Sequence, residues 1–383
     1  MKICVVTGSR ADYGYLSTLM RLVRDHPGCE LQVAATGMHL WKEFGETWRE
    51  VEQDGFSIDA RVAAPFTGTA SLDVARYVGG LVPGFAEAFA SLAPDFAVVL
   101  GDRYEIFAAA QAALFMRIPL AHLAGGDVTE GAYDEAMRHA ITKMAALHFP
   151  TNEDSASRII NMGEDPSRVH AVGSTSLDAL AEFTPLGRKE LEKRLDFALR
   201  GENLLVTFHP VTLSGSPSEN QARELLAALD DWAGAGDKGV IITAPNADTD
   251  GMRLKALYEE FAGQRSWVKV FDSLGRQKYF SAMTHVDAVV GNSSSGLYEA
   301  PSFAKPSVDI GDRQKGRIRA ESVAHCEPRR GEILAAIEKA CAMDASGAVN
   351  PYGRGDASKR ILDVLLGVNE PRTLIKKSFY EAT

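Results

Sequence analysis

The first half of the chain carries aspartates at three places where a short apolar run meets a turn or a helix. Asp102 follows residues 98–100, Asp127 follows a double glycine, and Asp134 opens a helical pattern. The carboxyl ends of parallel strands lie at one edge of a sheet, so we expect these side chains to converge on one cleft. Acids in a partly dry cleft acquire different pKa values, which provides one proton donor and one acceptor. Taken singly, each aspartate also fits a helix cap or a solvated surface position.

Arginines stand close in sequence to two of these acids. Arg103 follows Asp102 directly, and Arg138 lies four residues after Asp134, on the same face of the predicted helix. An Asp–Arg pair at the buried end of a strand is costly in a core and useful in a cleft. The pairs therefore strengthen the prediction of a polar site at this edge.

Two histidines and one polar turn also stand at predicted strand ends. His122 lies near the end of one predicted strand and His209 follows another. A single histidine is more often structural, and the strand-end place of His209 modestly favours a functional role. Residues 8–14 read Gly-Ser-Arg-Ala-Asp-Tyr-Gly and include Arg10 and Asp12. A glycine turn that opens a helix can hold an anion on its free N–H groups. An ordinary turn with a salt-bridged Arg10 remains the alternative.

The second half contains a candidate pyrophosphate cradle. Residues 291–296 read Gly-Asn-Ser-Ser-Ser-Gly after an apolar run. Small side chains let backbone N–H groups and hydroxyls approach phosphate oxygens, and a helix N-terminus favours negative charge. Arg313 can neutralise phosphate as a planar fork, and Glu299 can accept hydrogen bonds from ribose hydroxyls. A serine-rich turn without a ligand is the alternative.

Short apolar runs that alternate with amphipathic stretches must position these side chains. The predicted strands are residues 3–7, 31–35, 96–100, 119–123, 147–150 and 169–172, and then 204–208, 240–244, 268–271, 288–290 and 307–310. The predicted helical stretches are residues 16–23, 103–116, 177–199 and 356–379, the last broken near Pro371. This alternation is typical of doubly wound parallel sheets. We therefore predict an α/β fold with Rossmann-like domains at residues 1–175 and 176–360, and C-terminal helices at 361–383.

Size and composition limit the classes of function. A chain of 383 residues suits two domains, and the formal charge of −10 disfavours nucleic-acid binding. The four cysteines form no CxxC pair, which favours buried thiols in a reducing cytosol over disulfides or zinc. We recognise no signal peptide and no apolar stretch long enough to span a membrane. A cytoplasmic protein with no membrane or nucleic-acid partner is expected.

Together these motifs resemble the UDP-N-acetylglucosamine 2-epimerase family, in particular its hydrolysing branch from sialic-acid and related nonulosonate synthesis. The resemblance covers nearly the whole chain, and its motifs occur in the family's order. The segments that carry it are residues 9–13, 101–103, 122–127, 134–143, 208–210, 292–296 with Glu299, and 311–314.

The resemblance implies a GT-B-like architecture, in which two Rossmann-like domains face a cleft and the C-terminal helices cross back to the first. Candidates for proton transfer are Asp102, Asp127, Asp134, His122 and His209. Candidates for nucleotide and substrate binding are Arg10, Asp12, Arg103, Arg138, His209, Asn246, Ser273, Ser293, Ser294, Gly296, Glu299 and Arg313.

The reaction implied by the resemblance converts UDP-N-acetylglucosamine and water to N-acetylmannosamine and UDP. A base removes the C2 proton while UDP leaves C1 in an anti elimination, and water then adds to the 2-acetamidoglucal. General base catalysis and leaving-group stabilisation must act together because the C2 hydrogen is weakly acidic. The chemistry requires no metal and no redox cofactor.

Two departures from the family pattern leave alternatives open. Relatives often carry Glu where this chain has Ala124 and Asp127, so the identity of the C2 base is open. The motifs do not exclude a hydrolase of a GDP-linked diacetamido-trideoxyhexose from legionaminic acid synthesis, and a non-hydrolysing epimerase that keeps UDP attached is a second alternative. A GT-B glycosyltransferase shares the architecture but would need an acceptor site. Because of Ala124, a protein that binds nucleotide sugars as a sensor without catalysing a reaction is a further alternative. The family commonly forms dimers, so a homodimer or higher oligomer is expected, although burial within the chain equally explains the Ala-rich residues 103–116.

Overall fold

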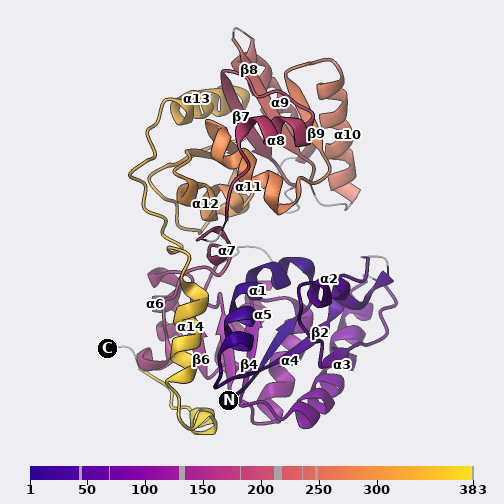
Figure 1. Cartoon of the computed structure of the whole chain (residues 1–383), viewed down its shortest axis with the longest axis vertical. Coiled ribbons are helices and arrows are strands. Elements are labelled where there is room, and N and C mark those ends of the chain that lie inside the picture. The colour runs from indigo at the N-terminus through magenta and orange to yellow at the C-terminus, as the bar shows by residue number, and fades with distance from the viewer. Residues whose placement is uncertain are drawn as a thin grey trace. The chain divides into compact units, whose positions relative to one another are not determined.

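A computed structural model of the protein describes residues 1–42, 45–68, 70–128, 134–181, 183–210, 218–234, 236–245 and 249–381. The chain divides into two compact units, Met1–Ala181 with Tyr352–Thr383, and Glu182–Pro351. Figure 1 shows the elements of both units. The sequence analysis placed these divisions after residues 175 and 360, and the units of the structure divide after 181 and 351.

The described strands of the first unit form a six-stranded, wholly parallel sheet in the order β3-β2-β1-β4-β5-β6. The strands are β1 (Lys2–Thr7), β2 (Glu30–Thr36), β3 (Ala60–Val62), β4 (Phe96–Leu100), β5 (Leu120–Leu123) and β6 (Leu147–Phe149). The helices of the unit are α1 (Arg10–Asp25), α2 (Trp48–Gln53), α3 (Ser71–Leu92), α4 (Tyr104–Phe115), α5 (Asp134–Met144), α6 (Glu153–Asn161), α7 (Asp178–Ala181) and α14 (Ala357–Leu366). Its short 3-10 helices are η1 (Gly37–Leu40), η3 (Pro166–Arg168) and η6 (Pro371–Ile375).

Alternation along β1 explains why helices cover both faces of this sheet. Ile3 and Val5 pack with α1 and α14 in one fully apolar cluster, whereas Cys4 and Val6 pack with α3 and α4 in another. All four side chains are fully buried. A strand that is apolar on both faces requires cover on both sides, as in doubly wound folds generally.

Small side chains let α4 lie close to its neighbours. The buried alanines of α4 join the core that includes α3 and β4. The Ala-rich composition of this helix is therefore accounted for by packing within the unit. The alanines concerned are Ala108, Ala109, Ala110, Ala112 and Ala113.

The chain returns to the first unit after residue 351, and α14 packs on α1. The Asp178 carboxylate accepts hydrogen bonds from the Ala357 and Ser358 N–H groups, at 2.8 and 2.7 Å. Carboxylates that satisfy free N–H groups stabilise the start of a helix. An aspartate nearly 180 residues earlier in the chain thus caps α14, drawn in yellow in Figure 1.

The described strands of the second unit form a six-stranded parallel sheet in the order β12-β11-β10-β7-β8-β9. Counted along the chain, this topology repeats that of the first sheet. The strands are β7 (Glu202–Thr207), β8 (Lys238–Thr243), β9 (Val268–Phe271), β10 (Ala288–Gly291), β11 (Ser307–Ile310) and β12 (Val323–Cys326). The helices are α8 (Arg188–Leu195), α9 (Ser218–Ala233), α10 (Thr249–Gly263), α11 (Gly275–His285), α12 (Ser295–Tyr298) and α13 (Arg330–Cys341), with 3-10 helices η4 (Ala300–Phe303) and η5 (Asp312–Gln314).

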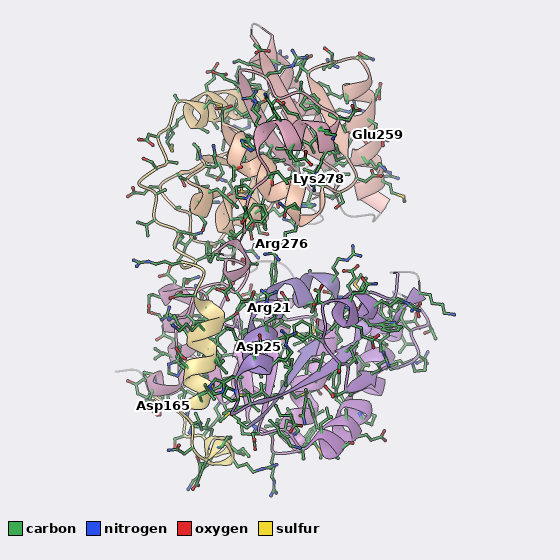
Figure 2. All side chains as sticks on the ribbon, in the orientation of Figure 1. Arg21, Asp25, Asp165, Glu259, Arg276 and Lys278 are labelled. Carbon is green, nitrogen blue, oxygen red and sulfur yellow. The ribbon has the colours of Figure 1, made fainter. Side chains whose placement is uncertain are left out.

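The surface helices are amphipathic. On α1 Leu19 is buried while Asp25 is exposed, and on α10 Tyr258 is buried while Glu259 is exposed (Figure 2). This arrangement is the ordinary one for a helix with one face on a sheet.

None of the helices in the described residues is long and apolar enough to cross a membrane.

The predicted α/β class with two parallel sheets is confirmed, and three details of the prediction are wrong. Residues 169–172 form no strand, although Val169 makes one isolated bridge to His148. The stretch 177–199 holds two helices, α7 and α8, in place of one. The edge strands β3 and β12 were not predicted.

Candidate functional site

Both sheets reverse their strand order at a central pair, which is β1 and β4 in the first unit and β7 and β10 in the second. Ligands of open α/β sheets bind beyond the carboxyl ends of the strands at this switch point. Some predicted site residues of each unit follow those central strands, such as Asp102 after β4 and His209 after β7, and the others lie on or after neighbouring elements. We describe the two sets separately.

In the first unit, Arg138 of α5 bridges the turns that follow β4 and β5. Its Nη2 donates to the Asp102 carboxylate, and its Nη1 donates to the main-chain oxygen of Asp127 at 2.7 Å. The Arg138 side chain is buried, and Asp102 is partly exposed, at 22%. A guanidinium with fixed donors is well suited to hold a carboxylate in one orientation. Arg138 thus fixes an accessible carboxylate at the end of β4.

Asp134, Arg138 and Thr142 lie at intervals of four residues along α5 and therefore share one face of the helix. Asp134 is half-buried, and its pKa is raised, first by burial and second by the Asp102 carboxylate. Arg138 and Arg103 lower this pKa in part. The predicted convergence of Asp102 and Asp134 on one region is consistent with this influence of the Asp102 carboxylate on Asp134.

His122 on β5 is fully buried, with both ring nitrogens engaged. Its Nε2–H donates to the Gly101 carbonyl at 2.8 Å, because a carbonyl can only accept. Nδ1 accepts from the Thr142 hydroxyl at 3.1 Å. Burial lowers the pKa of His122 to about 3, so the ring is neutral at physiological pH. The geometry favours a positioning role for His122 over the proton transfer expected from the sequence.

Asp127 lies in a turn that glycines make possible. Its Oδ1 accepts from the hydroxyls of Ser155 and Thr151, at 2.7 and 3.1 Å. Gly126 has a φ of 79°, and a Cβ there would lie 2.4 Å from the Ser155 carbonyl. A Cβ on Gly125 would lie 2.8 Å from His122 Nδ1. The double glycine therefore lets the turn pack against β5 and α6.

Ala124 precedes this turn with a φ of 57°. Left-handed backbone is uncommon for a residue with a Cβ and often marks functional regions. The Ala124 N–H is held by the Phe149 carbonyl at 3.0 Å, which ties this position to β6.

A second cluster in the first unit surrounds Arg103. Arg103 Nε donates to Glu105 Oε1 at 2.5 Å, and Glu105 is fully buried in the first turn of α4. Asp12 is buried nearby, and burial raises its pKa to about 6, with Arg103 lowering and Glu105 raising it. Glu105 was not among the predicted site residues, because an acid in the first turn of a helix is an ordinary feature.

Arg10 lies on the exposed side of α1 and pairs with Glu50, with Nε to Oε2 at 3.0 Å. This is the ordinary salt bridge that the sequence left open as an alternative. Ser9 caps α1 by accepting from the Asp12 N–H at 3.3 Å.

In the second unit, Asn292 clamps the turn that contains His209. Asn292 Oδ1 accepts from the His209 N–H at 2.7 Å, and Asn292 Nδ2 donates to the His209 carbonyl at 2.9 Å. The Asn292 side chain is fully buried. The turns after β7 and β10 are thus locked together at the switch point. Asn292 belongs to the predicted motif but was not singled out.

The serine loop after β10 depends on Gly291 and is braced from β11. Gly291 has a φ of 138°, and a Cβ there would lie 1.9 Å from the Thr207 carbonyl. The Asn292 carbonyl accepts from Arg313 Nη1 at 3.0 Å and from Gln314 Nε2 at 2.8 Å. Arg313 therefore lies against the loop, as a cation that borders a phosphate cradle would.

The remaining predicted binding residues are distributed as follows. Ser293 Oγ accepts from the Ser295 N–H at 3.3 Å, and Ser294 precedes α12. Glu299 is buried at the end of α12, and the Gly296 carbonyl accepts from Ser307. Ser273 is exposed and accepts from the Gly275 N–H at 3.2 Å. Asn246 lies outside the described residues.

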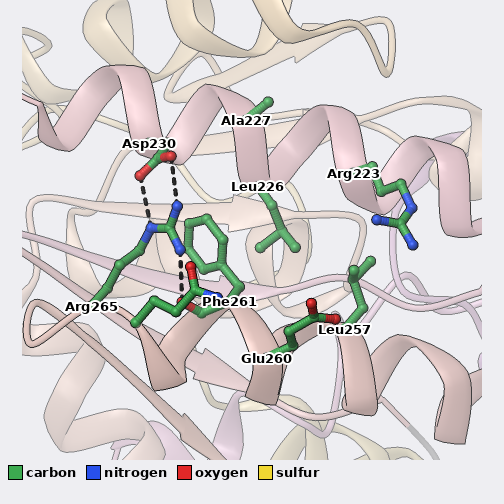
Figure 3. Close-up of a pocket in the computed structure, with 9 residues that line it drawn as sticks. Arg223, Leu226, Ala227, Asp230, Leu257, Glu260, Phe261 and Arg265 are labelled. Atoms are coloured by element: carbon green, nitrogen blue, oxygen red, sulfur yellow. Dashed lines mark hydrogen bonds and ion pairs between the residues drawn. The ribbon is translucent and has the colours of Figure 1, made fainter.

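A surface pocket occurs elsewhere in the second unit, between α9 and α10 (Figure 3). Arg265 pairs there with Asp230, at 2.8 and 2.7 Å, and its guanidinium lies over the Phe261 ring. None of its lining residues belongs to the loops after β7 or β10. In the part of the chain that the structure describes, no group of three or more His, Cys, Asp or Glu is placed to hold a metal ion.

Comparison with known proteins gives consistent matches over the chain. The family model for UDP-N-acetylglucosamine 2-epimerase matches residues 21–366. The GDP/UDP-N,N'-diacetylbacillosamine 2-epimerase (hydrolyzing) of Campylobacter jejuni is 38% identical over 327 residues, 85% of this chain and 84% of that protein. The UDP-N,N'-diacetylbacillosamine 2-epimerase (hydrolyzing) of Legionella pneumophila is 32% identical and covers 95% of both chains.

Solved structures share the fold. The UDP-GlcNAc 2-epimerase of Neisseria meningitidis, crystallised with UDP-GlcNAc, superposes with a TM-score of 0.75 at 19% identity. The match covers 96% of this chain and 100% of that one. At this identity the likeness concerns the GT-B-like fold alone.

Proposed function

The chain belongs to the UDP-N-acetylglucosamine 2-epimerase family, and from this premise we propose that it is a hydrolysing 2-epimerase of nucleotide-linked 2-acetamido sugars. Its reaction would convert UDP-N-acetylglucosamine and water to N-acetylmannosamine and UDP. The observation that carries the proposal is the placement of two carboxyl groups, Asp102 and Asp134, around Arg138. Relatives named as hydrolysing 2-epimerases support the hydrolysing class of reaction.

In the proposed mechanism, Asp102 removes the C2 proton of the sugar. Arg138 offsets the charge of Asp102 and holds its oxygens in place. The electron pair of the C2–H bond forms the C1–C2 double bond, and the C1–O bond breaks with departure of UDP. This step gives the 2-acetamidoglucal.

Asp134 is the proposed proton donor of the second step. Its raised pKa keeps the carboxyl group protonated to a higher pH than a solvated aspartate, which suits a general acid. Asp134 delivers its proton to C2 on the opposite face, water adds its hydroxyl to C1, and the remaining proton of that water passes to the Asp134 carboxylate. The proton that Asp102 took in the first step is released to solvent. Asp127, oriented by Ser155 and Thr151, is the proposed group that orders the water.

The second unit is proposed to bind the nucleoside diphosphate. The clamp of Asn292 on His209 and the bracing of the serine loop by Arg313 support this assignment. Fixed donors beside a cation stabilise the charge that develops on the leaving diphosphate. Glu299 is the proposed acceptor for ribose hydroxyls.

A diacetamido sugar is the second candidate substrate. The 38% identity with the diacetylbacillosamine enzyme of Campylobacter jejuni favours it. The name of that relative includes both GDP and UDP, so the NMR experiment described below also tests which nucleobase the substrate of this chain carries.

Two further expectations remain proposals. All four cysteines are free, which fits a reducing compartment such as the cytoplasm. A homo-oligomer is proposed from family membership alone, because the buried alanines of α4 pack within the unit. Light scattering on the purified protein measures the oligomeric state.

Proton NMR in D2O tests the proposed function. The protein is incubated with UDP-N-acetylglucosamine, and separately with UDP- and GDP-linked diacetylbacillosamine. We expect free 2-epimerised sugar from at least one of them, together with free nucleoside diphosphate. Product that remains attached to UDP would identify a non-hydrolysing epimerase, and binding without turnover would identify a sensor.

A further inference from the structure

Arg103 presents its guanidinium within a mainly acidic, closely packed cluster. Its Nε donates to Glu105 at 2.5 Å, its Nη2 lies 3.3 Å from Met38 Sδ, and its guanidinium lies 5.8 Å from the Tyr104 ring centre. The Arg103 side chain is 34% exposed and that of Glu105 is fully buried. Glu105 therefore occupies one edge of the Arg103 guanidinium, and part of the Arg103 side chain remains exposed to solvent.

Glycines shape the space that Glu105 fills. A Cβ on Gly8, in the turn after β1, would lie 2.7 Å from Glu105 Oε1. A Cβ on Gly37, after β2, would lie 3.0 Å from the same atom, and the φ of Gly37 is 57°. The turns after the two strands thus close around this carboxylate. Its place at the N-terminus of α4 is favourable for a negative charge.

Two carboxylate oxygens of the cluster are buried without a partner. Among the described residues, neither Glu105 Oε2 nor Asp12 Oδ2 has a hydrogen bond. A buried acceptor without a donor is costly, so such atoms in native proteins usually meet an ordered water or mark a functional region.

The charge balance of the cluster disfavours a phosphate. Glu105 neutralises Arg103, and Asp12 adds a second carboxyl group, so no positive charge is in excess. His39, which also faces Arg103, is buried, and its pKa is lowered to about 4. Tyr77 and Tyr104 are the other titratable neighbours of Glu105, and burial raises the pKa of Tyr77. A diphosphate here would meet two carboxyl groups at close range.

We propose that Glu105 is a positioning residue that fixes Arg103 as a directional hydrogen-bond donor to the neutral sugar part of the substrate, not as a counter-ion of its diphosphate. The inference rests on the proposed function and deepens it, since it assigns the Asp12–Arg103–Glu105 cluster to recognition of sugar hydroxyl and acetamido groups. Arg103 stands beside Asp102 in the chain, and its charge is felt by Asp134. A donor at this position orients the sugar against the acids that are proposed to act on it.

The test separates nucleotide affinity from turnover. Arg103→Ala, Arg103→Lys and Glu105→Gln are compared with Glu52→Gln, which removes the exposed Arg61–Glu52 ion pair of the same unit. The Kd for UDP and GDP is measured by calorimetry, and kcat and KM are measured with the nucleotide sugar that the wild type turns over. Thermal midpoints establish that each variant is folded.

We expect kcat/KM to fall about 10- to 100-fold in all three cluster variants, because a charge-assisted hydrogen bond is lost, while the nucleotide Kd changes less than about 3-fold. Arg103→Lys should not restore kcat/KM, since lysine keeps the positive charge but lacks the planar set of N–H donors of arginine. The double variant Arg103→Ala/Glu105→Gln should be no worse than the more impaired single variant. Glu52→Gln should match the wild type.

A nucleotide Kd weakened about 10-fold or more in Arg103→Ala, with rescue by lysine, would overturn the inference in favour of a diphosphate counter-ion. Unchanged kcat/KM in Arg103→Ala would overturn the inference as well. This measurement is decisive even where Glu105→Gln does not fold. Failure of the proposed function gives a different result, because the wild type itself would then release no free sugar.

Discussion

Arg138 on α5 donates to the carboxylate of Asp102, which stands 36 residues earlier at the end of β4. The same guanidinium donates to the main chain of Asp127 after β5. One side chain therefore sets the position of α5 relative to two neighbouring strand ends. Since Asp134 lies one helical turn before Arg138, this contact also sets the separation of the two carboxyl groups that we propose as base and acid.

Replacement of Arg138 tests this relationship. Arg138→Lys keeps the charge and cannot reach both acceptors, so we expect kcat to fall about 10- to 100-fold and stability to fall by about 1–3 kcal/mol. Steady-state kinetics and urea denaturation measure the two effects. Arg194→Lys, in the exposed Arg194–Glu190 pair of α8, is the matched control and should change neither. Full activity of Arg138→Lys would show that the bridge is dispensable.

The clamp of Asn292 has a structural twin in the same unit. Asn203, near the start of β7 and away from the switch point, accepts from the Arg200 N–H at 2.8 Å and donates to the Arg200 carbonyl at 2.9 Å. Both Asn292→Ala and Asn203→Ala should cost about 1–3 kcal/mol of stability, because two partly buried main-chain groups lose their partners in each case. Only Asn292→Ala should weaken UDP binding, by about 10-fold or more. Equal UDP affinity in the two variants would argue against nucleotide binding at the serine loop.

The C-terminal segment is anchored by a buried carboxylate. Glu164 accepts from Lys143 and Lys377, each at 2.5 Å, and from His148 at 3.0 Å. Lys377→Met should destabilise the protein by about 1–3 kcal/mol, since one cation of a buried carboxylate is lost. Chemical denaturation measures this effect.

The neighbouring Lys376→Met is the control for Lys377→Met and should be near neutral, because its side chain is exposed. Combining Lys377→Met with Glu164→Gln should cost less than the sum of the single changes. Strict additivity would indicate that the ion pair contributes nothing.

Buried histidines predict loss of stability in acid. The pKa values of His122 and His39 are lowered to about 3 and 4, whereas in the unfolded chain they return to about 6.5. Above pH 6.5 neither histidine lowers the free energy of unfolding. Below pH 6.5 each of them lowers it by about 1.4 kcal/mol per pH unit. The pKa of Glu164 is lowered to about 2, so its contribution is lost between about pH 4.5 and 2.

Asp12 acts in the opposite direction, because its pKa is raised to about 6 and the folded state binds its proton more tightly. Between about pH 6 and 4, the stability that protonation of Asp12 adds offsets about the stability that one buried histidine removes. Urea midpoints at pH 7, 6 and 5 should therefore fall, and His122→Gln should reduce the slope. Midpoints that do not change with pH would contradict the buried neutral state of His122.

Apolar runs predicted most of both sheets because strands buried on both faces leave an uninterrupted signal. The edge strands β3 and β12 gave no such signal, since most of their residues are either exposed or only partly buried. Residues 169–172 carry an apolar pattern and run beside β6, where the His170 and Val172 N–H groups donate to the His148 and Pro150 carbonyls, but they form only one isolated bridge, at Val169. Local sequence does not report whether a segment beside a sheet completes the ladder of an edge strand.

The candidate site was predictable in its residue types and less so in its pairings. Strand-end positions identified Asp102 and Asp134, but the contact of Asp102 with Arg138 depends on how α5 docks, which no spacing encodes. His122 was predicted at a strand end, and its burial and two hydrogen bonds became visible only in the fold. Glu105 was missed because an acid in the first turn of a helix is ordinary, and its burial depends on Gly8 and Gly37 of distant turns.

The most direct test of the proposed reaction is deuterium incorporation at C2 in D2O, followed by NMR for the wild type and for Asp102→Asn. Our account predicts that the wild type releases free epimerised sugar with deuterium at C2, and that Asp102→Asn loses turnover by about 100-fold or more while its UDP affinity stays within a few-fold. Free sugar that retains protium at C2, or an Asp102→Asn variant that remains active, would contradict it.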